Sequence, residues 1–328
     1  MIAVVTGGSA GVGRATAREF AARGWDVAII ARNRTRLDAT ADELRKRGVR
    51  ALPIAADVAD AEAIEAAAEQ VEHELGPIDA WVNNAMATIF ATFDRVSAEE
   101  FRRGTEVTYL GQVHGTMAAL SRMRPRDRGT IVNVGSALAY RAIPLQSVYC
   151  GAKYAVRGFT DALRTELMHD KSAVRLIMVH LPAVNTPQFD WALNKMGRRP
   201  QPVPPIFQPE APARAIADAA MGRGSREIWV GMPTWQAIIA NKLAPGVIDR
   251  YLARTGYRSQ LTKEPVPADA PANLFASPDG NWGAHGRFDD GAYEVTLEQR
   301  MGRHRGAIAL ALAGLAGFGL AMLIRGLR

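Results

Sequence analysis

Short apolar runs alternate with longer amphipathic stretches along the first 230 residues of the chain. Short apolar runs bounded by turn residues indicate buried strands, whereas apolar positions that recur every three to four residues indicate helices. Seven strands are predicted, at 2–5, 26–31, 50–55, 78–82, 129–134, 174–180 and 227–230. Six helices are predicted between them, at 12–23, 35–47, 61–75, 97–122, 147–169 and 209–221. The alternation predicts a doubly wound α/β fold, a seven-stranded parallel sheet with helices on both faces.

The pattern changes at two places beyond the sixth strand. Five prolines between 200 and 209 exclude a regular helix there, and we expect an irregular excursion beside the sheet, of the kind that forms lids. Residues 235–252 repeat apolar positions at helical spacing, with Pro245 interrupting them. This amphipathic stretch is expected to lie either on the domain or on a lipid surface.

The C-terminal third differs in composition from the rest. Residues 257–304 are rich in Pro, Gly and Asp, which predicts a linker of low order with one short packed piece at 273–275. Residues 306–324 form 19 consecutive uncharged, largely apolar positions with arginines on both sides, long enough to span roughly 28 Å as a helix. We predict a folded α/β domain at 1–256, a linker at 257–304 and a transmembrane or membrane-anchor helix at 305–325; a buried core helix is the alternative for this last segment.

Charge and rare residues exclude several other functions. The net charge is +7, from 40 Lys and Arg against 33 Asp and Glu, but the basic residues are scattered and match no nucleic-acid motif, so no nucleic-acid partner is expected. The single cysteine, Cys150, excludes an internal disulfide, and the six histidines lack ligand spacing, so no metal site is predicted. No basic segment precedes the first strand, so the domain at 1–256 is expected in the cytoplasm, associated with a membrane through the C-terminal helix.

A glycine-rich turn joins the first strand to the first helix. It reads Thr6-Gly7-Gly8-Ser9-Ala10-Gly11-Val12-Gly13. Glycines at this spacing let the backbone turn tightly and approach a pyrophosphate, which the free N–H groups at the helix N-terminus bind. The turn predicts a dinucleotide-binding, Rossmann-type domain, although glycines between a strand and a helix also serve close packing alone.

The end of the second strand indicates which dinucleotide is bound. An acidic residue there would bind the ribose 2′-OH of NAD, whereas a basic residue accommodates the 2′-phosphate of NADP. The chain has Arg32 at this place and no acid, so NADP(H) is the predicted cofactor. Arg34 and Arg36, further along, either assist Arg32 or are ordinary helix-surface charges, and the second interpretation is preferred.

Ser136, Tyr149 and Lys153 form the candidate catalytic set. Tyr149 and Lys153 are four residues apart and lie on one face of a helix, where an ammonium beside the phenol would lower its pKa and make it a general acid or base. Ser136, just past the fifth strand, can donate a hydrogen bond to a substrate oxygen. A Tyr and a Lys at this spacing also occur together by chance.

Taken in order, these motifs resemble the short-chain dehydrogenase/reductase family over residues 1–231. Besides the glycine turn and the Ser, Tyr and Lys set, Asn83-Asn84-Ala85 fits the family's N-N-A-G motif and Asp57-Val58 its adenine-side acid. The resemblance implies hydride transfer between a nicotinamide and a carbonyl or alcohol carbon, and dimers or tetramers formed through the helices at 97–122 and 147–169. It also implies cofactor binding by Thr6, Gly7, Ser9, Gly11, Gly13, Arg32, Asp57, Val58, Asn83, Ala85, Tyr149, Lys153 and Thr186.

The chain departs from the family pattern at three positions. Met86 stands where a glycine is usual, Thr108 where an asparagine is usual, and Ala183 replaces the glycine after Pro182. Thr108 keeps the backbone carbonyl that the family uses to hold a water near the lysine, so a proton relay is still expected.

The predicted function is an NADP(H)-dependent oxidoreductase acting on an apolar small-molecule substrate. Apolar side chains on the expected substrate side support this, namely Phe189, Trp191, Leu193, Met196, Ile206 and Phe207. Two alternatives stay open: an NADP(H)-binding sensor or scaffold without turnover, and an epimerase or dehydratase using the same fold.

Overall fold

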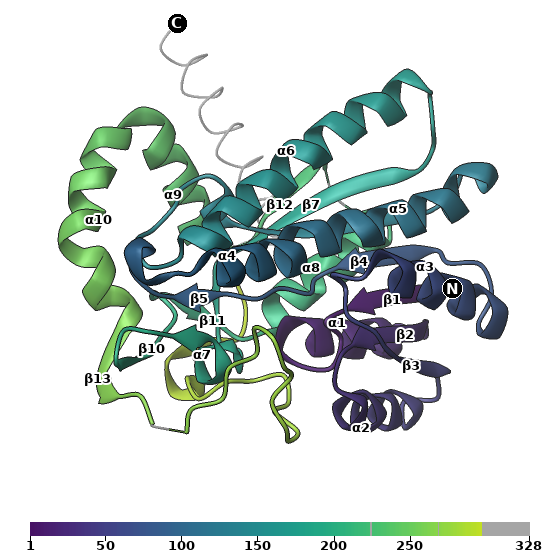
Figure 1. Ribbon diagram of the computed structural model, residues 1–328. Helices are drawn as coiled ribbons and strands as arrows, with labels where there is room; N and C mark the ends of the chain where they lie inside the picture. Colours follow the sequence, from purple (N-terminus) through teal and green to yellow (C-terminus); the bar gives the residue numbers. More distant parts are fainter. Residues whose placement is uncertain (224, 268, 297–328) are drawn as a thin grey trace, which may run out of the picture.

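The computed structural model describes residues 1–223, 225–267 and 269–296, and a seven-stranded parallel sheet forms its centre (Figure 1). The strands follow the order β12-β7-β6-β4-β1-β2-β3, and every neighbouring pair is parallel. Their bounds are β1 Ile2–Thr6, β2 Asp26–Ala31, β3 Ala51–Ala55, β4 Ala80–Asn83, β6 Thr130–Ser136, β7 Arg175–Leu181 and β12 Glu227–Trp229. All seven predicted strands are confirmed.

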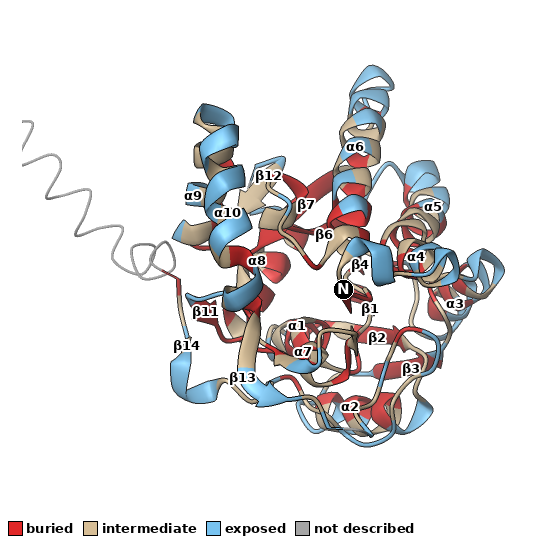
Figure 2. Cartoon of the chain, turned by 60° about the vertical axis from the view of Figure 1, so that its left-hand side comes forward, coloured by how far each residue is buried: buried red, intermediate tan, exposed pale blue. Residues whose placement is uncertain are grey.

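Helices cover both faces of the sheet, as predicted. One face packs against α1 (Gly11–Ala22), α2 (Arg34–Arg45) and α8 (Glu210–Ala220), and the other against α3 (Ala61–Glu74), α5 (Gly111–Met123) and α6 (Ser147–His169). Successive strand residues point to opposite faces, so Val4 joins the core under α3 and α5 while Val5 joins the core under α1 and α2. Figure 2 shows the strands as the buried layer between these helices.

Local sequence signals fix where several helices begin. The side chain of Asn33 accepts a hydrogen bond from Arg36 N at the start of α2, and Asp60 does the same for α3. Ser97 and Glu100 form a reciprocal capping box at α4 (Ala98–Thr105). One turn of π-helix, Glu106–Leu110, follows and leads into α5, so the helix predicted at 97–122 is one helical path with a local widening.

The excursion predicted after β7 contains only short elements. These are β8 (Ala183–Val184), α7 (Gln188–Trp191), β9 (Leu193–Asn194), which pairs with β5 (Ile89–Phe90), β10 (Arg198–Pro200) and β11 (Ile206–Phe207). They place the chain beside the carboxyl ends of the central strands, where a ligand would bind in a sheet of this kind (Figure 1).

The amphipathic stretch predicted at 235–252 is a pair of helices. They are α9 (Met232–Leu243) and α10 (Pro245–Gln260), and Pro245 begins the second one because the first helical turn tolerates a proline. The pair stands beside the sheet with an exposed outer surface (Figure 2). Within the described parts of the chain, none of the helices combines the length and apolar character needed to cross a bilayer.

The chain beyond α10 returns to the body of the domain. It forms β13 (Leu261–Pro265), which pairs with β10, and later β14 (Ala292–Tyr293), which pairs with β11. Leu274 of the predicted packed piece is 1% exposed and belongs to the core beside α3 and α5. The division of the chain at 256 and 304 stays a prediction, and the predicted membrane helix at 305–325 lies outside the described residues.

Candidate active site

A cavity of about 640 Å³ opens at the carboxyl ends of β1, β2, β4, β6 and β7. It extends from the glycine-rich turn to the pair α9 and α10. The structure brings most of the predicted site residues to its wall: Gly7, Ser9, Gly11, Arg32, Asp57, Val58, Ala85, Ser136, Tyr149, Lys153 and Thr186. Residues from seven separate parts of the sequence therefore meet around one space.

The other three predicted cofactor residues lie behind this wall. Thr6 donates from Oγ1 to Val82 O at 3.3 Å and accepts from the backbone of Asn84, joining β1 to β4. Asn83 is fully buried and accepts a 2.8 Å hydrogen bond from Trp81 Nε1. Gly13 faces the backbone of the turn itself. These three residues support the wall of the cavity and do not line it. Asn84, which follows Asn83, does line the cavity.

The glycine turn has the geometry of an anion cradle. Gly7 and Gly11 have φ of +67° and +55°, which favour glycine, and a Cβ at Gly7 would lie 2.9 Å from Ala85 Cα. A Cβ at Gly13 would lie 2.6 Å from Asn84 Nδ2 and closer still to the carbonyl oxygen of Gly7. The turn directs the N-terminus of α1 into the cavity. A pyrophosphate would have room beside the glycines, and the positive end of the helix dipole would stabilise its negative charge.

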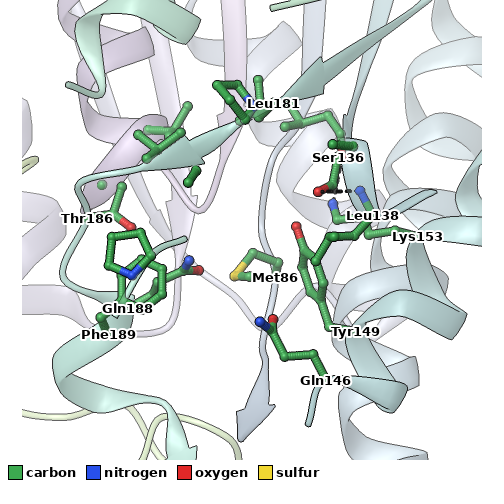
Figure 3. A pocket seen from close by; sticks show the side chains of 18 of the residues that line it. Met86, Ser136, Leu138, Gln146, Tyr149, Lys153, Leu181, Thr186, Gln188 and Phe189 are labelled. Carbon is green, nitrogen blue, oxygen red and sulfur yellow. Dashed lines mark hydrogen bonds between the residues drawn. The ribbon is translucent and has the colours of Figure 1, made fainter. Parts of the chain in front are cut away.

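Ser136, Tyr149 and Lys153 gather on one side of the cavity (Figure 3). Ser136 ends β6, and its Oγ accepts a 3.1 Å hydrogen bond from Leu138 N. Tyr149 and Lys153 come from adjacent turns of α6, and Lys153 Nζ lies 5.6 Å from the centre of the tyrosine ring. The three polar ends face the same space, with Thr186 and Gln188 on its other side (Figure 3).

The electrostatics of this set differ from the sequence-based expectation. Burial lowers the pKa of Lys153 to about 7, and its Nζ donates to Val134 O at 2.6 Å. Burial raises the pKa of Tyr149 above its ordinary value, while the interaction with Ser136 works in the opposite direction. The expected lowering of the phenol pKa by Lys153 is wrong for this structure, because burial penalises both charged forms and the amine binds a carbonyl instead of the phenol oxygen.

Two arginines line the opposite, adenosine-side end of the cavity. Arg32 follows β2 as predicted, and its guanidinium donates to the backbone carbonyls of Asn273 and Phe275. The interpretation of Arg36 as a surface charge is wrong: the residue is 4% exposed and lines the cavity. Arg34 does lie on the surface, 65% exposed, where it pairs with Asp38 at 2.9 Å.

Several lining residues were missed by the sequence analysis. The inner face of α9 and α10 closes the cavity with Ala237, Ile248 and Leu252, and Gln146 Nε2 donates to Gln260 Oε1 at 2.8 Å across this boundary. The helical repeat at 235–252 was the available signal, but repetition alone does not say what a helix packs against. Among the apolar residues expected on the substrate side, Phe189 and Trp191 line the cavity, whereas Leu193, Met196, Ile206 and Phe207 do not.

The three departures from the family pattern have different surroundings. Met86 lines the cavity between Tyr149 and Gln188 (Figure 3). Thr108 is buried in the π-helical turn, and its Oγ1 donates to Ala87 O at 2.9 Å. Ala183 lies in β8 and pairs with Ile206. Only Met86 and Ala183 are therefore in reach of a ligand in the cavity.

This arrangement is that of a Rossmann-type α/β protein with a Ser, Tyr and Lys site. The sequence model of the short chain dehydrogenase family matches residues 1–196. YxnA of Bacillus subtilis, an uncharacterised oxidoreductase, is 32% identical over 288 residues, which cover 87% of this chain and 80% of YxnA. The chain belongs to the short-chain dehydrogenase/reductase family of oxidoreductases.

Solved structures agree with this fold. An alcohol dehydrogenase from the archaeon Thermococcus sibiricus, complexed with 5-hydroxy-NADP, is 28% identical with a TM-score of 0.60, covering 70% of this chain and 95% of that one. A short chain dehydrogenase/reductase from Burkholderia phymatum in complex with NAD is 22% identical with a TM-score of 0.66, covering 76% of this chain and 94% of that one. The second likeness concerns the fold alone.

Proposed function

We propose that this enzyme is an NADP(H)-dependent oxidoreductase that transfers hydride between the nicotinamide and the carbonyl or alcohol carbon of an apolar substrate. The observation that carries the proposal is one cavity with Ser136, Tyr149 and Lys153 at one end and Arg32 and Arg36 at the other. The Thermococcus sibiricus enzyme, with its 5-hydroxy-NADP complex, supports a nicotinamide cofactor.

The residues present suit such a cofactor along its whole length. The glycine turn and the N-terminus of α1 would hold the pyrophosphate, Arg32 the 2′-phosphate, Asp57 and Val58 the adenine, and Thr186 the nicotinamide side. When bound, the cofactor supplies or accepts the hydride, which is the redox part of the chemistry. The protein contributes position and electrostatics.

The side chains of the site handle the proton. Tyr149 gives its phenolic proton to the substrate oxygen during reduction and takes it back during oxidation. Ser136 Oγ donates a hydrogen bond to the same oxygen and orients the carbonyl. Lys153 is fixed by its hydrogen bond to Val134 O, with its Nζ 5.6 Å from the centre of the phenol ring, where it would bind the nicotinamide ribose.

The cavity beyond the catalytic set supports an apolar substrate. Its wall there includes Met86, Leu138, Phe189, Ile248 and Leu252. These side chains offer contact area with no charge, while Gln146 and Gln188, which also line the cavity, provide polar groups that could orient a ligand. A long-chain or cyclic ketone, aldehyde or alcohol matches this wall better than a polar sugar.

A substrate panel with a matched pair of variants tests the proposal. Ketones and aldehydes from small sugars to long-chain and polycyclic compounds are incubated with NADPH, and nucleotide oxidation is followed at 340 nm. Tyr149→Phe should abolish turnover while leaving NADPH affinity within about threefold, because the ring remains and only the proton donor is lost. Tyr154→Phe is the control. Tyr154 follows Lys153 on α6 and does not line the cavity, so this variant should keep normal rates.

The outcomes separate the candidates. Turnover that persists in Tyr149→Phe refutes the role of the phenol. Tight NADPH binding with no turnover on any compound favours the alternative of a sensor or scaffold. A preference for sugars over apolar carbonyls refutes the substrate class while leaving the redox chemistry intact.

We also propose that the protein is membrane-associated, with its catalytic domain in the cytoplasm. The apolar run at 306–324 supports this, as does an exposed apolar row on α9 and α10 that includes Trp235, Ile239, Leu243 and Val247. Leu315→Arg should move the full-length protein from the membrane pellet to the supernatant, because a charge near the centre of a span costs about 3 kcal/mol. Ala66→Arg, at an exposed position of α3, is the control; an unchanged pellet fraction in both variants would refute the anchor.

A homodimer or homotetramer is the proposed assembly. Exposed apolar side chains on the helices predicted to form the interface support it, namely Phe101, Met117 and Met168. Light scattering in detergent should give two or four chains, and Met117→Glu should reduce that number. A monomer at micromolar concentration would refute the assembly.

A further inference from the structure

A segment from beyond the Rossmann strands lies across the adenosine side of the cavity. We name residues 273–286 the strap. It runs between α7 and α2 (Figure 1), and Asn273, Ser277 and Pro278 line the cavity. The strap thus closes a side of the cavity that β1, β2 and their loops do not cover.

The strap contacts three parts of the predicted cofactor site. At β2, the carbonyls of Asn273 and Phe275 accept from Arg32. At the glycine turn, Gly283 O accepts from Gly11 N at 3.0 Å. At the loop after β7, Gly286 packs so closely on Thr186 that a Cβ would lie 2.6 Å from Thr186 O.

Arg36 is a buried cation beside the strap that has few partners among the described residues. Its Nη2 donates to Ser277 Oγ, and its guanidinium lies 4.9 Å from the ring centre of Trp191. Its Nε and Nη1 are buried and have no hydrogen-bond partner among the described residues. Burying N–H donors of an arginine without acceptors is costly, which points to an acceptor that binds there.

The charges around Arg36 favour an anion. Burial and the neighbouring Arg32 both lower the pKa of Arg36, while Asp279 raises it. Neither Arg32 nor Arg36 forms an ion pair within the described parts of the chain, and the nearby Asp57 pairs with Arg103. Arg36 is buried and Arg32 is half-buried, and two such cations near each other without a bound carboxylate are stabilised by a group that carries two negative charges.

The geometry points to a composite 2′-phosphate site, in which Arg36 and Ser277 of the strap bind the phosphate together with Arg32. This inference rests on the proposed use of NADP(H) and adds to it residues of the strap, outside the strand-and-helix pattern that binds the dinucleotide. A phosphate monoester accepts hydrogen bonds from two guanidinium groups and from a hydroxyl at once. Trp191 holds the Arg36 guanidinium in place through a cation–π contact.

The site makes affinity for the phosphate depend on the strap. Arg32 binds strap carbonyls and Arg36 binds the strap hydroxyl, so a phosphate between them would join β2, α2 and the strap. Binding energy from the phosphate therefore also stabilises the strap in its closed position. Nucleotides without the 2′-phosphate lack this coupling.

Equilibrium binding to the full-length protein tests the site without any turnover. The probes are the pairs NADPH and NADH, and 2′,5′-ADP and 5′-AMP, which differ by the one phosphate. Arg36→Gln should raise the Kd of NADPH and of 2′,5′-ADP on the order of 10- to 100-fold, which is the usual value of a charge-assisted hydrogen bond. The Kd of NADH and of 5′-AMP should change by less than about threefold. Arg34→Gln, two residues earlier on the same helix but exposed, is the matched control and should leave all four values unchanged.

Ser277→Ala provides a second variant that keeps both cations. It should weaken 2′,5′-ADP by roughly 3- to 10-fold, the usual range for one neutral hydrogen bond, with an unchanged melting temperature. In hydrogen exchange, amides of the strap should gain protection with 2′,5′-ADP and not with 5′-AMP. A merely structural role of the strap would not produce this difference between the two probes.

The failures are distinguishable. If Arg32→Gln loses the preference for 2′,5′-ADP while Arg36→Gln and Ser277→Ala keep it, the composite site is overturned and the proposed cofactor stands. If the unmodified protein binds 5′-AMP as tightly as 2′,5′-ADP, both the composite site and NADP(H) use are overturned.

Discussion

Replacing Lys153 by methionine should change how the stability of the protein depends on pH. The amine is 1% exposed and its pKa is about 7, against an ordinary 10.5. At about 1.4 kcal/mol for each pKa unit, this lowering corresponds to about 5 kcal/mol of difference between burying the charged and the neutral amine. Lys153 therefore destabilises the fold most where it is charged.

The sign follows from proton linkage. Below pH 7 the amine is protonated in both states, and its full cost is present. Between pH 7 and 10.5 the unfolded chain binds the proton and the folded chain does not, so stability rises with pH across this window. Lys153→Met lacks this rise. The difference in the free energy of unfolding between Lys153→Met and the unmodified protein should therefore be largest below pH 7 and shrink by about 5 kcal/mol towards pH 10.5.

The substitution leaves the neighbouring groups satisfied. Val134 O loses the lysine donor but keeps Gln112 Nε2 at 3.1 Å, so no buried carbonyl is left without a partner. Methionine fills a similar volume with apolar atoms, which a buried position favours. The stability difference is therefore dominated by removal of the buried charge, while enzymatic activity is expected to be lost.

Urea unfolding at intervals from pH 6 to 10 measures the effect. The free energies of unfolding of the two proteins are subtracted at each pH, which removes the titration of all groups that they share. Lys46→Met, at an exposed helix end, is the control and should follow the unmodified protein. A constant difference between Lys153→Met and the unmodified protein across the range would refute the buried, lowered pKa.

Two further substitutions probe the frame of the site. Gly13→Ala should abolish dinucleotide binding in a titration with NADPH, because its Cβ would collide with the carbonyl of Gly7, whereas Gly158→Ala, with nothing within 4 Å, should not weaken binding. Asn83→Ala should lower the free energy of unfolding by about 1–3 kcal/mol in urea, because it leaves the buried Trp81 Nε1 without its acceptor; an unchanged midpoint would show that the buried polar network contributes nothing.

The local parts of the structure could be predicted from sequence. The seven strands follow from short continuous apolar runs, which suit strands buried on both faces, and the covering helices follow from apolar positions that recur every three to four residues. The glycine turn and the Tyr149 and Lys153 pair are also local, because the chemistry requires a fixed spacing within one turn or one helix. In the structure, the turn and the Tyr149 and Lys153 pair have the local geometry that their spacing predicts.

Tertiary structure alone decided what surrounds those motifs. Arg36 has the sequence pattern of a surface residue, yet the strap, more than 230 residues further along, buries it. The pKa of Tyr149 depends on how much of the ring the whole fold removes from water, and spacing to a lysine says nothing of that. Local sequence determines the backbone conformation and the face of a helix or strand on which a side chain lies. The burial of that side chain and the charges around it depend on every segment that packs against it, and segments distant in sequence come together only in the folded structure.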